Sequence, residues 1–213
     1  MTEPGLKALS AKDVRGRLLI AAVQLFARKG YAATSVREIV EAAGVTKPSL
    51  YYYFRNKEGI FLAMMQEAMT AHRAVLDDVR TSGGTATERI VLLIDRVYTL
   101  ALENVLAVRA IDAIYYGPRE EAPEFDFAQI HGEFDALLRN LVEEAVTAGE
   151  LPGGDVDEVV LMLVGGFLAG KTSFADRCHP GEPLPPESLR RIIRTILDGV
   201  RARPKGRTEE ERC

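Results

Sequence analysis

Residues Thr34 to Phe61 read TSVREIVEAAGVTKPSLYYYFRNKEGIF, and this stretch decides the fold of the N-terminal region. In its first part apolar residues recur at i, i+3, i+4 and i+7, with Thr34 or Ser35 available as a cap and Gly44 as the stop. A second helix can begin at once, because Thr46 can cap and Pro48 is tolerated in a first turn. Two short helices joined by a tight turn predict a helix-turn-helix.

The second short helix divides into two faces at 100° per residue. Leu50, Tyr53 and Phe54 fall within one sector, which we predict to pack on the core. The opposite side carries hydroxyl groups from three residues: Ser49, Tyr51 and Tyr52. A helix that enters the DNA major groove needs this division, since hydrogen-bonding groups read bases and phosphates while the other face packs.

Residue chemistry assigns roles within this segment. Side chains able to recognise base edges are predicted to carry sequence information: Arg37, Lys47 and Ser49. Hydroxyls, free amides at helix N-termini and one further lysine are predicted to contact phosphates: Thr34, Ser35, Thr46, Tyr51, Tyr52 and Lys57. The alternative is an ordinary solvated helix face, but three adjacent tyrosines are uncommon on a surface that has no partner.

Charge is distributed unevenly along the chain. The formal net charge of the 213 residues is −4, yet residues 1–60 hold ten Lys or Arg against five Asp or Glu, a net charge of +5. The remainder holds 17 basic against 26 acidic residues, net −9. A basic N-terminal part on an acidic body predicts binding of a polyanion at one end only.

Both this stretch and RGRLLIAAVQLFARKGYAATS before it resemble the DNA-binding domain of TetR-family regulators over roughly residues 13–70. Matched position by position, the resemblance implies Gly44 as the turn glycine and DNA contacts for eight residues: Thr34, Ser35, Arg37, Lys47, Ser49, Tyr51, Tyr52 and Lys57. Tyr53 stands where the family usually has His, and Val40 where it often has Ala; both are packing positions. The resemblance also implies a homodimer that reads a near-palindromic operator, usually as a repressor released by a small molecule.

The rest of the chain also shows helical periodicity and no sustained strand-like alternation, which predicts an all-α fold of about nine helices. Beyond the three N-terminal helices near 13–29, 35–43 and 46–54, the expected spans are 57–80, 85–106, 107–116, 124–149, 155–177 and 187–202. We expect a DNA-binding domain at 12–70, a ligand-binding and dimerisation domain at 71–203, and a frayed tail at 204–213.

Two C-terminal segments are predicted to form an association surface. One is apolar nearly all round from Val156 to Phe174, with Gly165, Gly166 and Gly170 permitting close helix approach. Residues expected at the dimer contact are Val164, Phe167, Leu168, Leu189, Ile192, Ile193, Ile196 and Leu197. A purely intramolecular core is the alternative, although two-fold dimers dominate among oligomers.

The middle helices carry adaptable, aromatic and polar residues, a mixture that suits a small-molecule pocket. The candidate lining residues are Met64, Met65, Met69, His72, Tyr98, Arg109, Tyr115, Tyr116, Phe127, His131 and Phe134. For any one of them core packing is an equally simple role, so only the set indicates a ligand.

Gly165 to Thr172 match the phosphate-binding pattern G-x-x-x-x-G-K-[ST], which would indicate a nucleotide-binding protein. We do not expect this function, because the preceding segment begins with a helix cap and only about 40 residues follow, too few for the parallel sheet that such a loop needs. No catalytic motif is present, so catalysis is not predicted. A helical protein-binding adaptor would keep the apolar surface but would not require the basic N-terminal part.

Composition sets the remaining expectations. No stretch reaches the roughly 18 apolar residues of a spanning helix, and no secretory signal precedes residue 13, so a soluble, cytoplasmic protein is expected. Cys178 and Cys213 lack the spacing of a zinc site or a disulfide framework. We therefore predict no metal and no cofactor, and as partners operator DNA, a second copy of the chain and a small-molecule effector.

Overall fold

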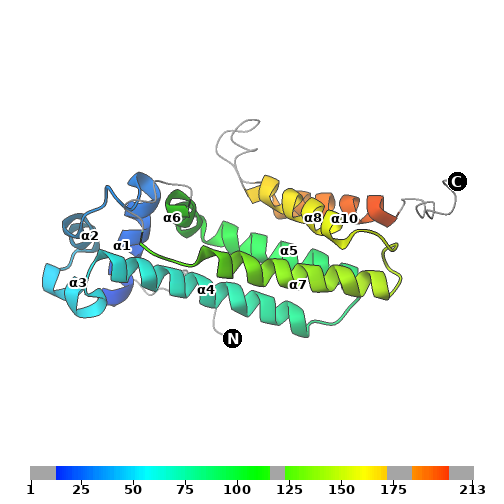
Figure 1. The fold of residues 1–213 in the computed structure, drawn as a ribbon. Coiled ribbons are helices and arrows are strands. Elements are labelled where there is room, and N and C mark those ends of the chain that lie inside the picture. Colours follow the sequence, from blue (N-terminus) through cyan, green and yellow to red (C-terminus); the bar gives the residue numbers. More distant parts are fainter. Residues whose placement is uncertain (1–12, 116–122, 172–183, 202–213) are drawn as a thin grey trace, which may run out of the picture. The chain divides into compact units, whose positions relative to one another are not determined.

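A computed structural model describes residues 13–115, 123–171 and 184–201. Within these residues the chain forms nine helices and no strand, which confirms the all-α prediction (Figure 1). The helices are α1 (Val14–Lys29), α2 (Val36–Ala43), α3 (Lys47–Phe54), α4 (Lys57–Thr81), α5 (Ala86–Glu103), α6 (Val105–Tyr115), α7 (Phe127–Thr147), α8 (Val156–Lys171) and α10 (Pro186–Arg201). No helix in the described part of the chain is long and apolar enough to cross a membrane.

Two compact units make up the chain, and each is built from two segments. The first, called the head unit below, contains Met1–Ala74 and Leu100–Ile130; the second, the body unit, contains Val75–Thr99 and His131–Cys213. The head unit is discontinuous because α6 packs against α1. The predicted boundary between two contiguous domains, at residues 70 and 71, stays a prediction. The compact units differ from those domains because each unit combines two separate segments of the chain.

A single apolar core holds the head unit together. Leu18 and Phe26 of α1, Ile39 of α2 and Leu50 of α3 are fully buried, and Phe61 of α4 joins them. Ala107, Ala110 and Ile114 of α6 complete the cluster. Burying a side chain of this size contributes about 1.5 to 3 kcal/mol, so this core fixes the three short helices that are too short to be stable alone.

In the body unit, α8 packs along α10, and two glycines set their separation. A Cβ at Gly166 would lie 3.2 Å from Ile196 Cδ1, and a Cβ at Gly170 would lie 3.1 Å from Leu189 Cδ1. Gly165, by contrast, has open space around it. Gly166 and Gly170 therefore permit a close approach between two helices of the same chain. The sequence interpretation had instead assigned this close approach to the association surface.

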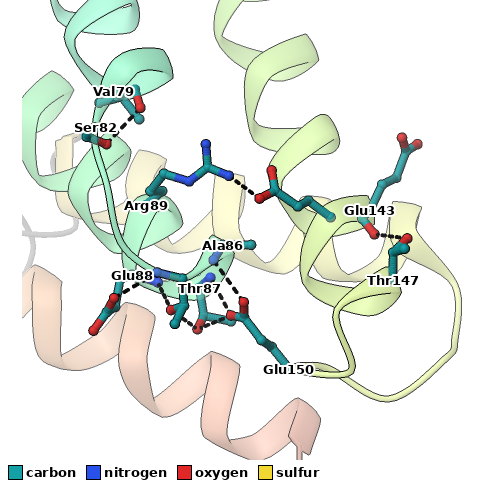
Figure 2. A network of polar contacts seen from close by, with 11 residues as sticks. Val79, Ser82, Ala86, Thr87, Glu88, Arg89, Glu143, Thr147 and Glu150 are labelled. Atoms are coloured by element: carbon teal, nitrogen blue, oxygen red, sulfur yellow. Dashed lines mark hydrogen bonds and ion pairs between the residues drawn. The ribbon is translucent and has the colours of Figure 1, made fainter.

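A polar network ties the start of α5 to the end of α7 (Figure 2). Glu150 accepts hydrogen bonds from the Ala86 amide (2.9 Å) and from the amide and hydroxyl of Thr87 (2.8 and 2.7 Å). Arg201, the last residue of α10, donates to the Glu150 carbonyl at 3.1 Å and to Thr87 Oγ1 at 2.9 Å. Partial burial opposes ionisation of Glu150, but these hydrogen bonds outweigh it and leave the carboxyl pKa below its ordinary value.

Several predicted boundaries shift. The break expected between residues 106 and 107 lies at Asn104, whose side-chain and backbone amides both donate to the Leu100 carbonyl, at 2.8 and 3.2 Å. The helix expected from residue 124 begins at Phe127, after Asp126 accepts from the Ala128 amide. The expected extension of α8 to residue 177, residue 202 and the tail at 204–213 lie outside the described residues.

Candidate nucleic-acid interface

The turn between α2 and α3 has the geometry that a helix-turn-helix requires. Gly44 adopts left-handed angles, φ 63° and ψ 41°, and its amide donates to Glu41 and Val40 carbonyls. The Val45 amide then donates to Val40 at 3.0 Å, which closes the turn. A residue with a Cβ would strain this conformation by roughly 1 kcal/mol, so glycine here fixes the angle at which α3 leaves α2.

At the N-terminus of α2, Ser35 and Glu38 form the reciprocal capping arrangement. Ser35 Oγ accepts from the Glu38 amide, and the Ser35 amide donates to Glu38 Oε2 at 2.9 Å. Lys29 Nζ donates to Glu38 Oε1, and this bond together with those from Ser35 lowers the Glu38 pKa to about 2. Ser35 is exposed and accessible to a phosphate. Because its hydroxyl already donates to Glu38 Oε2 at 2.8 Å, it must exchange that bond to donate to a phosphate.

Thr34 lies differently from the prediction. Its side chain is 2% exposed, and Oγ1 donates to the Gly30 carbonyl at 2.7 Å. The residue stabilises the turn that follows α1, because it satisfies a carbonyl left over at that helix end. A phosphate contact through this buried hydroxyl is not supported by the geometry, which corrects the assignment.

Helix α3 presents a narrow buried face and a broad exposed one. Leu50 and Phe54 are buried, whereas Tyr51, Tyr52 and Tyr53 are exposed, Tyr52 at 82%. Tyr53 at 43% exposure corrects the prediction that it packs on the core. It lies about 80° from the midpoint of Leu50 and Phe54 at 100° per residue, and its ring meets the ring of Tyr52 edge-on at 5.0 Å.

The predicted polar readers surround this face. Thr46 and Ser49 lie with their hydroxyls 3.1 Å apart at the start of α3, and Lys47 beside them is exposed. Arg37 is exposed on α2 and pairs with Glu41, Nε to Oε1 at 2.6 Å. This pair uses the Nε donor, and the guanidinium carries four further N–H donors on its two terminal nitrogens, the groups that suit a guanine edge.

Lys57 is held at the first residue of α4. Its Nζ donates to the Tyr31 carbonyl at 2.9 Å and lies 4.1 Å from the centroid of the Tyr31 ring. Burial, with Glu58 nearby, raises the pKa of Tyr31. The ammonium is thus anchored at a helix N-terminus, where positive charge and free amides favour an anion.

Arg55 is a residue that the sequence interpretation missed. It follows α3 directly, is exposed, and has a positive φ of 64°. Its backbone amide donates to the Tyr51 carbonyl and so caps α3. In the sequence, the signal that could have identified Arg55 is a cation immediately after α3. The strained backbone at this residue is visible only in the structure.

The predicted pocket residues divide between the two units. Met64 and Met65 are fully buried in the core of the head unit. The same unit, outside that fully buried core, contains Met69, His72, Arg109, Tyr115 and Phe127. The body unit contains Tyr98, His131 and Phe134, and Tyr116 lies outside the described residues. Tyr98 is buried, which raises its pKa, and its hydroxyl donates to the carbonyls of Gly170 and Leu184 at 3.0 and 2.6 Å. The structure therefore gives Met64, Met65 and Tyr98 packing roles.

Within the head unit, Tyr115 and Phe127 border a hollow of about 880 Å³. Four of its eight described lining residues, Phe125 among them, belong to the segment that leads into α7. The rings of Phe127 and Tyr115 meet at 5.3 Å, and those of Phe125 and Phe127 at 5.0 Å. Two members of the predicted ligand set are thus in ring contact beside this hollow, and their role in binding a ligand stays a prediction.

The residues predicted for dimerisation split into an inner and an outer group. Leu189, Ile193 and Leu197 are buried within the body unit, and Phe167 packs against the rings of Tyr98 and Phe134. Leu168 and Ile192 are exposed, as is Leu161 at 72%, a residue absent from the prediction. The other two members, Val164 and Ile196, are half-buried.

The phosphate-loop alternative fails on geometry. Gly165 to Lys171 are part of α8, and Thr172 lies outside the described residues. A continuous helix cannot wrap its amides around a phosphate as the glycine-rich loop does. The match to the pattern is a coincidence of composition.

An all-α chain whose basic N-terminal part presents a helix-turn-helix with an exposed, hydroxyl-bearing second helix is a DNA-binding transcriptional regulator. The model of the bacterial regulatory proteins of the tetR family matches residues 18–64. The chain is 36% identical over 168 residues to the uncharacterised HTH-type transcriptional regulator YvkB of Bacillus subtilis, covering 76% of this chain and 84% of that protein. It therefore belongs to the TetR family.

Two further relatives extend the comparison. The HTH-type transcriptional repressor KstR2 of Rhodococcus jostii is 29% identical over 209 residues, 94% of this chain and 98% of that protein. The structure of the regulator FadR of Bacillus subtilis in complex with stearoyl-CoA has the same fold, with a TM-score of 0.61 at 21% identity over 87% of this chain and 97% of that one.

Proposed function

We propose that this chain is a homodimeric repressor that binds a near-palindromic operator through α3 and is released from it by a small molecule. The observation that carries the DNA-binding part is the outer face of α3, where Lys47 and three exposed tyrosines stand on a part of the chain with a net charge of +5. KstR2, a repressor by name, matches nearly the whole chain and supports the direction of regulation.

Contacts with DNA are proposed in two groups. Lys47 and Ser49, together with the terminal nitrogens of Arg37, would read base edges in the major groove. Contacts to phosphates are proposed for Ser35, Thr46, Tyr51, Tyr52 and Lys57, to which we add Arg55 because it is exposed directly after α3. Tyrosine suits this position because its ring packs on sugar and its hydroxyl bonds a phosphate oxygen.

A dimer is proposed from the outer faces of α8 and α10. Leu161 and Leu168 on α8, with Ile192 on α10, are large aliphatic side chains exposed in the single chain. A second copy would cover them and place two heads on half-sites about 34 to 36 Å apart. Such a regulator acts at the chromosome, so we propose a cytoplasmic location and no catalytic role.

The structure of FadR is a complex with stearoyl-CoA, but at 21% identity that comparison supports only the fold.

Selection of bound fragments from the source genome, followed by fluorescence-anisotropy titration of the selected fragment, tests the proposal. A selected palindrome that binds as one dimer per site would support it; absence of any preference over a scrambled fragment at equal salt would refute it.

A further inference from the structure

Tyr53 lies between the buried and the exposed faces of α3. The residue is 43% exposed, so it does not belong to the core, and the proposed DNA contacts do not include it. Helical geometry turns it about 100° away from Tyr52, which is the most exposed of the three tyrosines of α3, at 82%. A large aromatic side chain at this boundary can act on DNA binding through its neighbour, without touching DNA itself.

The ring of Tyr53 contacts the ring of Tyr52 edge-on. Their centroids are 5.0 Å apart and their planes lie at 86° to each other. This is one of the arrangements that aromatic pairs prefer, because the positive edge of one ring meets the negative face of the other. A tyrosine on an open surface exchanges among staggered rotamers. The edge-on contact favours the rotamer of Tyr52 that keeps it, and so restricts a side chain that is otherwise almost fully in solvent.

Tyr53 is itself held from the side of the core. Its ring centroid lies 6.4 Å from that of Phe54, which is buried. Arg15 of α1 places its guanidinium carbon 5.6 Å from the Phe54 centroid, and its Nη1 pairs with Glu67 Oε1 of α4 at 3.2 Å. Phe54 is therefore held by side chains of two other helices, and Tyr53 connects this buried ring to the exposed ring of Tyr52.

Restriction of Tyr52 before binding increases affinity, because a side chain that becomes immobile at an interface loses conformational entropy. A ring that is already held in the free protein loses less. The gain is limited by the strength of one aromatic pair, which corresponds to about two- to tenfold in affinity.

We propose that Tyr53 is a positioning residue for DNA binding: its ring holds the ring of Tyr52 in the orientation that meets the DNA, and its own hydroxyl is not required. The inference rests on the proposed function, in which Tyr52 contacts a phosphate. The ring contact in the free protein does not depend on that function, so the contact and its effect on DNA binding are measured separately.

The ring contact is tested by NMR of the free protein. The chain has only seven tyrosines and eight phenylalanines, so ring labelling of both gives a simple spectrum, assigned with single Tyr→Phe and Phe→Leu variants. A nuclear Overhauser effect should join the ring protons of Tyr52 and Tyr53. The pair of Tyr31 and Phe61, whose centroids are 5.8 Å apart, is the reference contact. A visible reference effect without one between Tyr52 and Tyr53 would overturn the proposal.

Two variants of Tyr53 separate its ring from its hydroxyl. Tyr53→Ala should weaken binding to the selected operator fragment about two- to tenfold, because the partner ring of Tyr52 is lost. Tyr53→Phe keeps the ring and should bind as wild type does. Fluorescence anisotropy at constant salt measures both affinities. If Tyr53→Phe lost as much affinity as Tyr53→Ala, the hydroxyl would contact DNA itself and the proposal would be wrong.

A double-mutant cycle shows whether Tyr53 acts through Tyr52. In a Tyr52→Ala background, Tyr53→Ala should cause no further loss of operator affinity. Tyr51→Ala is the matched background, because Tyr51 is 51% exposed on the same helix and the printed sequence places it two residues from Tyr53, while the ring of Tyr53 pairs with Tyr52 and Phe54. There the loss should be complete.

An equal loss in both backgrounds would show that Tyr53 acts on the fold or directly on DNA, and would refute the positioning role. Failure of the wild-type chain to bind any operator would refute the proposed function and the role of Tyr53 together. Absence of the ring contact, with operator binding intact, would refute the role of Tyr53 alone.

Discussion

The large apolar side chains exposed on α3 differ in chemistry from those exposed on α8 and α10. On α3 the exposed residues are Tyr51, Tyr52 and Tyr53, each with a hydroxyl at its tip. On α8 and α10 they are Leu161, Leu168 and Ile192, which have no polar atom beyond the backbone. Tyrosine can bury its ring and still bond a polar partner, whereas leucine requires an apolar one. The first surface therefore suits DNA and the second suits a second copy of the chain.

The largest expected effect comes from placing charge on the aliphatic surface. Leu161→Glu combined with Leu168→Glu should prevent dimerisation, because two carboxylates would be buried without partners. Operator affinity should then fall roughly 100-fold or more, since one head binds one half-site without the gain from linkage. Sedimentation measures the mass and anisotropy the affinity.

Ala148→Glu, at an exposed position at the end of α7, is the control and should remain dimeric. A double variant that keeps the mass of wild type would show that the aliphatic surface is not the dimer contact.

On the tyrosine-bearing surface, Lys47→Ala should cost about 1 to 3 kcal/mol of operator binding and relax sequence preference. Lys57→Ala should weaken binding to all sequences and reduce the slope of log affinity against log salt by about 1. Titrations of operator and scrambled DNA at several salt concentrations separate the two signatures. If both variants lowered all affinities equally, Lys47 would be a phosphate contact.

The carboxyl of Glu150 caps the start of α5 (Figure 2), and its backbone carbonyl accepts from Arg201 at the end of α10. Glu150→Ala removes the cap of α5 and should lower the free energy of unfolding by about 1 to 2 kcal/mol. Thermal and urea unfolding measure this change. Glu143→Ala, near the same end of α7, should have a smaller effect, since the bond from Thr147 goes to the Glu143 backbone carbonyl; equal losses would mean that the cap contributes nothing specific.

The smallest effect concerns the support beneath the tyrosine-bearing surface. The Glu38 pKa is lowered from 4.5 to about 2, so its ionised form stabilises the fold above pH 4.5. This contribution should be lost as the pH falls from 4.5 towards 2, where the folded state must also take up the proton. Glu38→Gln should therefore show a shallower fall of Tm with pH in that window. An unchanged pH profile would exclude Glu38 as a contributor.

Local signals predicted the head well. Of the two caps expected for α2, Ser35 is the one found, and Gly44 as the stop and Pro48 in a first turn are found as expected. Thr46 occupies the position before α3, but its side chain makes no capping hydrogen bond. The buried pair Leu50 and Phe54 followed from helical geometry. Tyr53 was wrongly placed because an eight-residue helix contacts the core over a narrower sector than periodicity alone suggests.

Features that depend on distant parts of the chain were not predictable in this way. Thr34 is buried because the turn after Gly30 folds its hydroxyl inward, and α6 joins the head unit by packing on α1. Likewise, Gly166 and Gly170 accommodate α10 of the same chain. Sequence spacing shows that a glycine allows close approach, but it does not identify which helix approaches.

Arg55 places two requirements of the protein in opposition. Its backbone, φ 64° and ψ −45°, lies in a sparsely populated region that costs an L-residue about 1 to 3 kcal/mol. Arg55→Gly would relieve that strain, yet it would also remove a cation from the end of α3. Thermal selection alone should therefore favour glycine, while selection for operator occupancy should retain arginine. Position 55 is a point where improvement of the fold and retention of regulation cannot both be achieved by the same substitution.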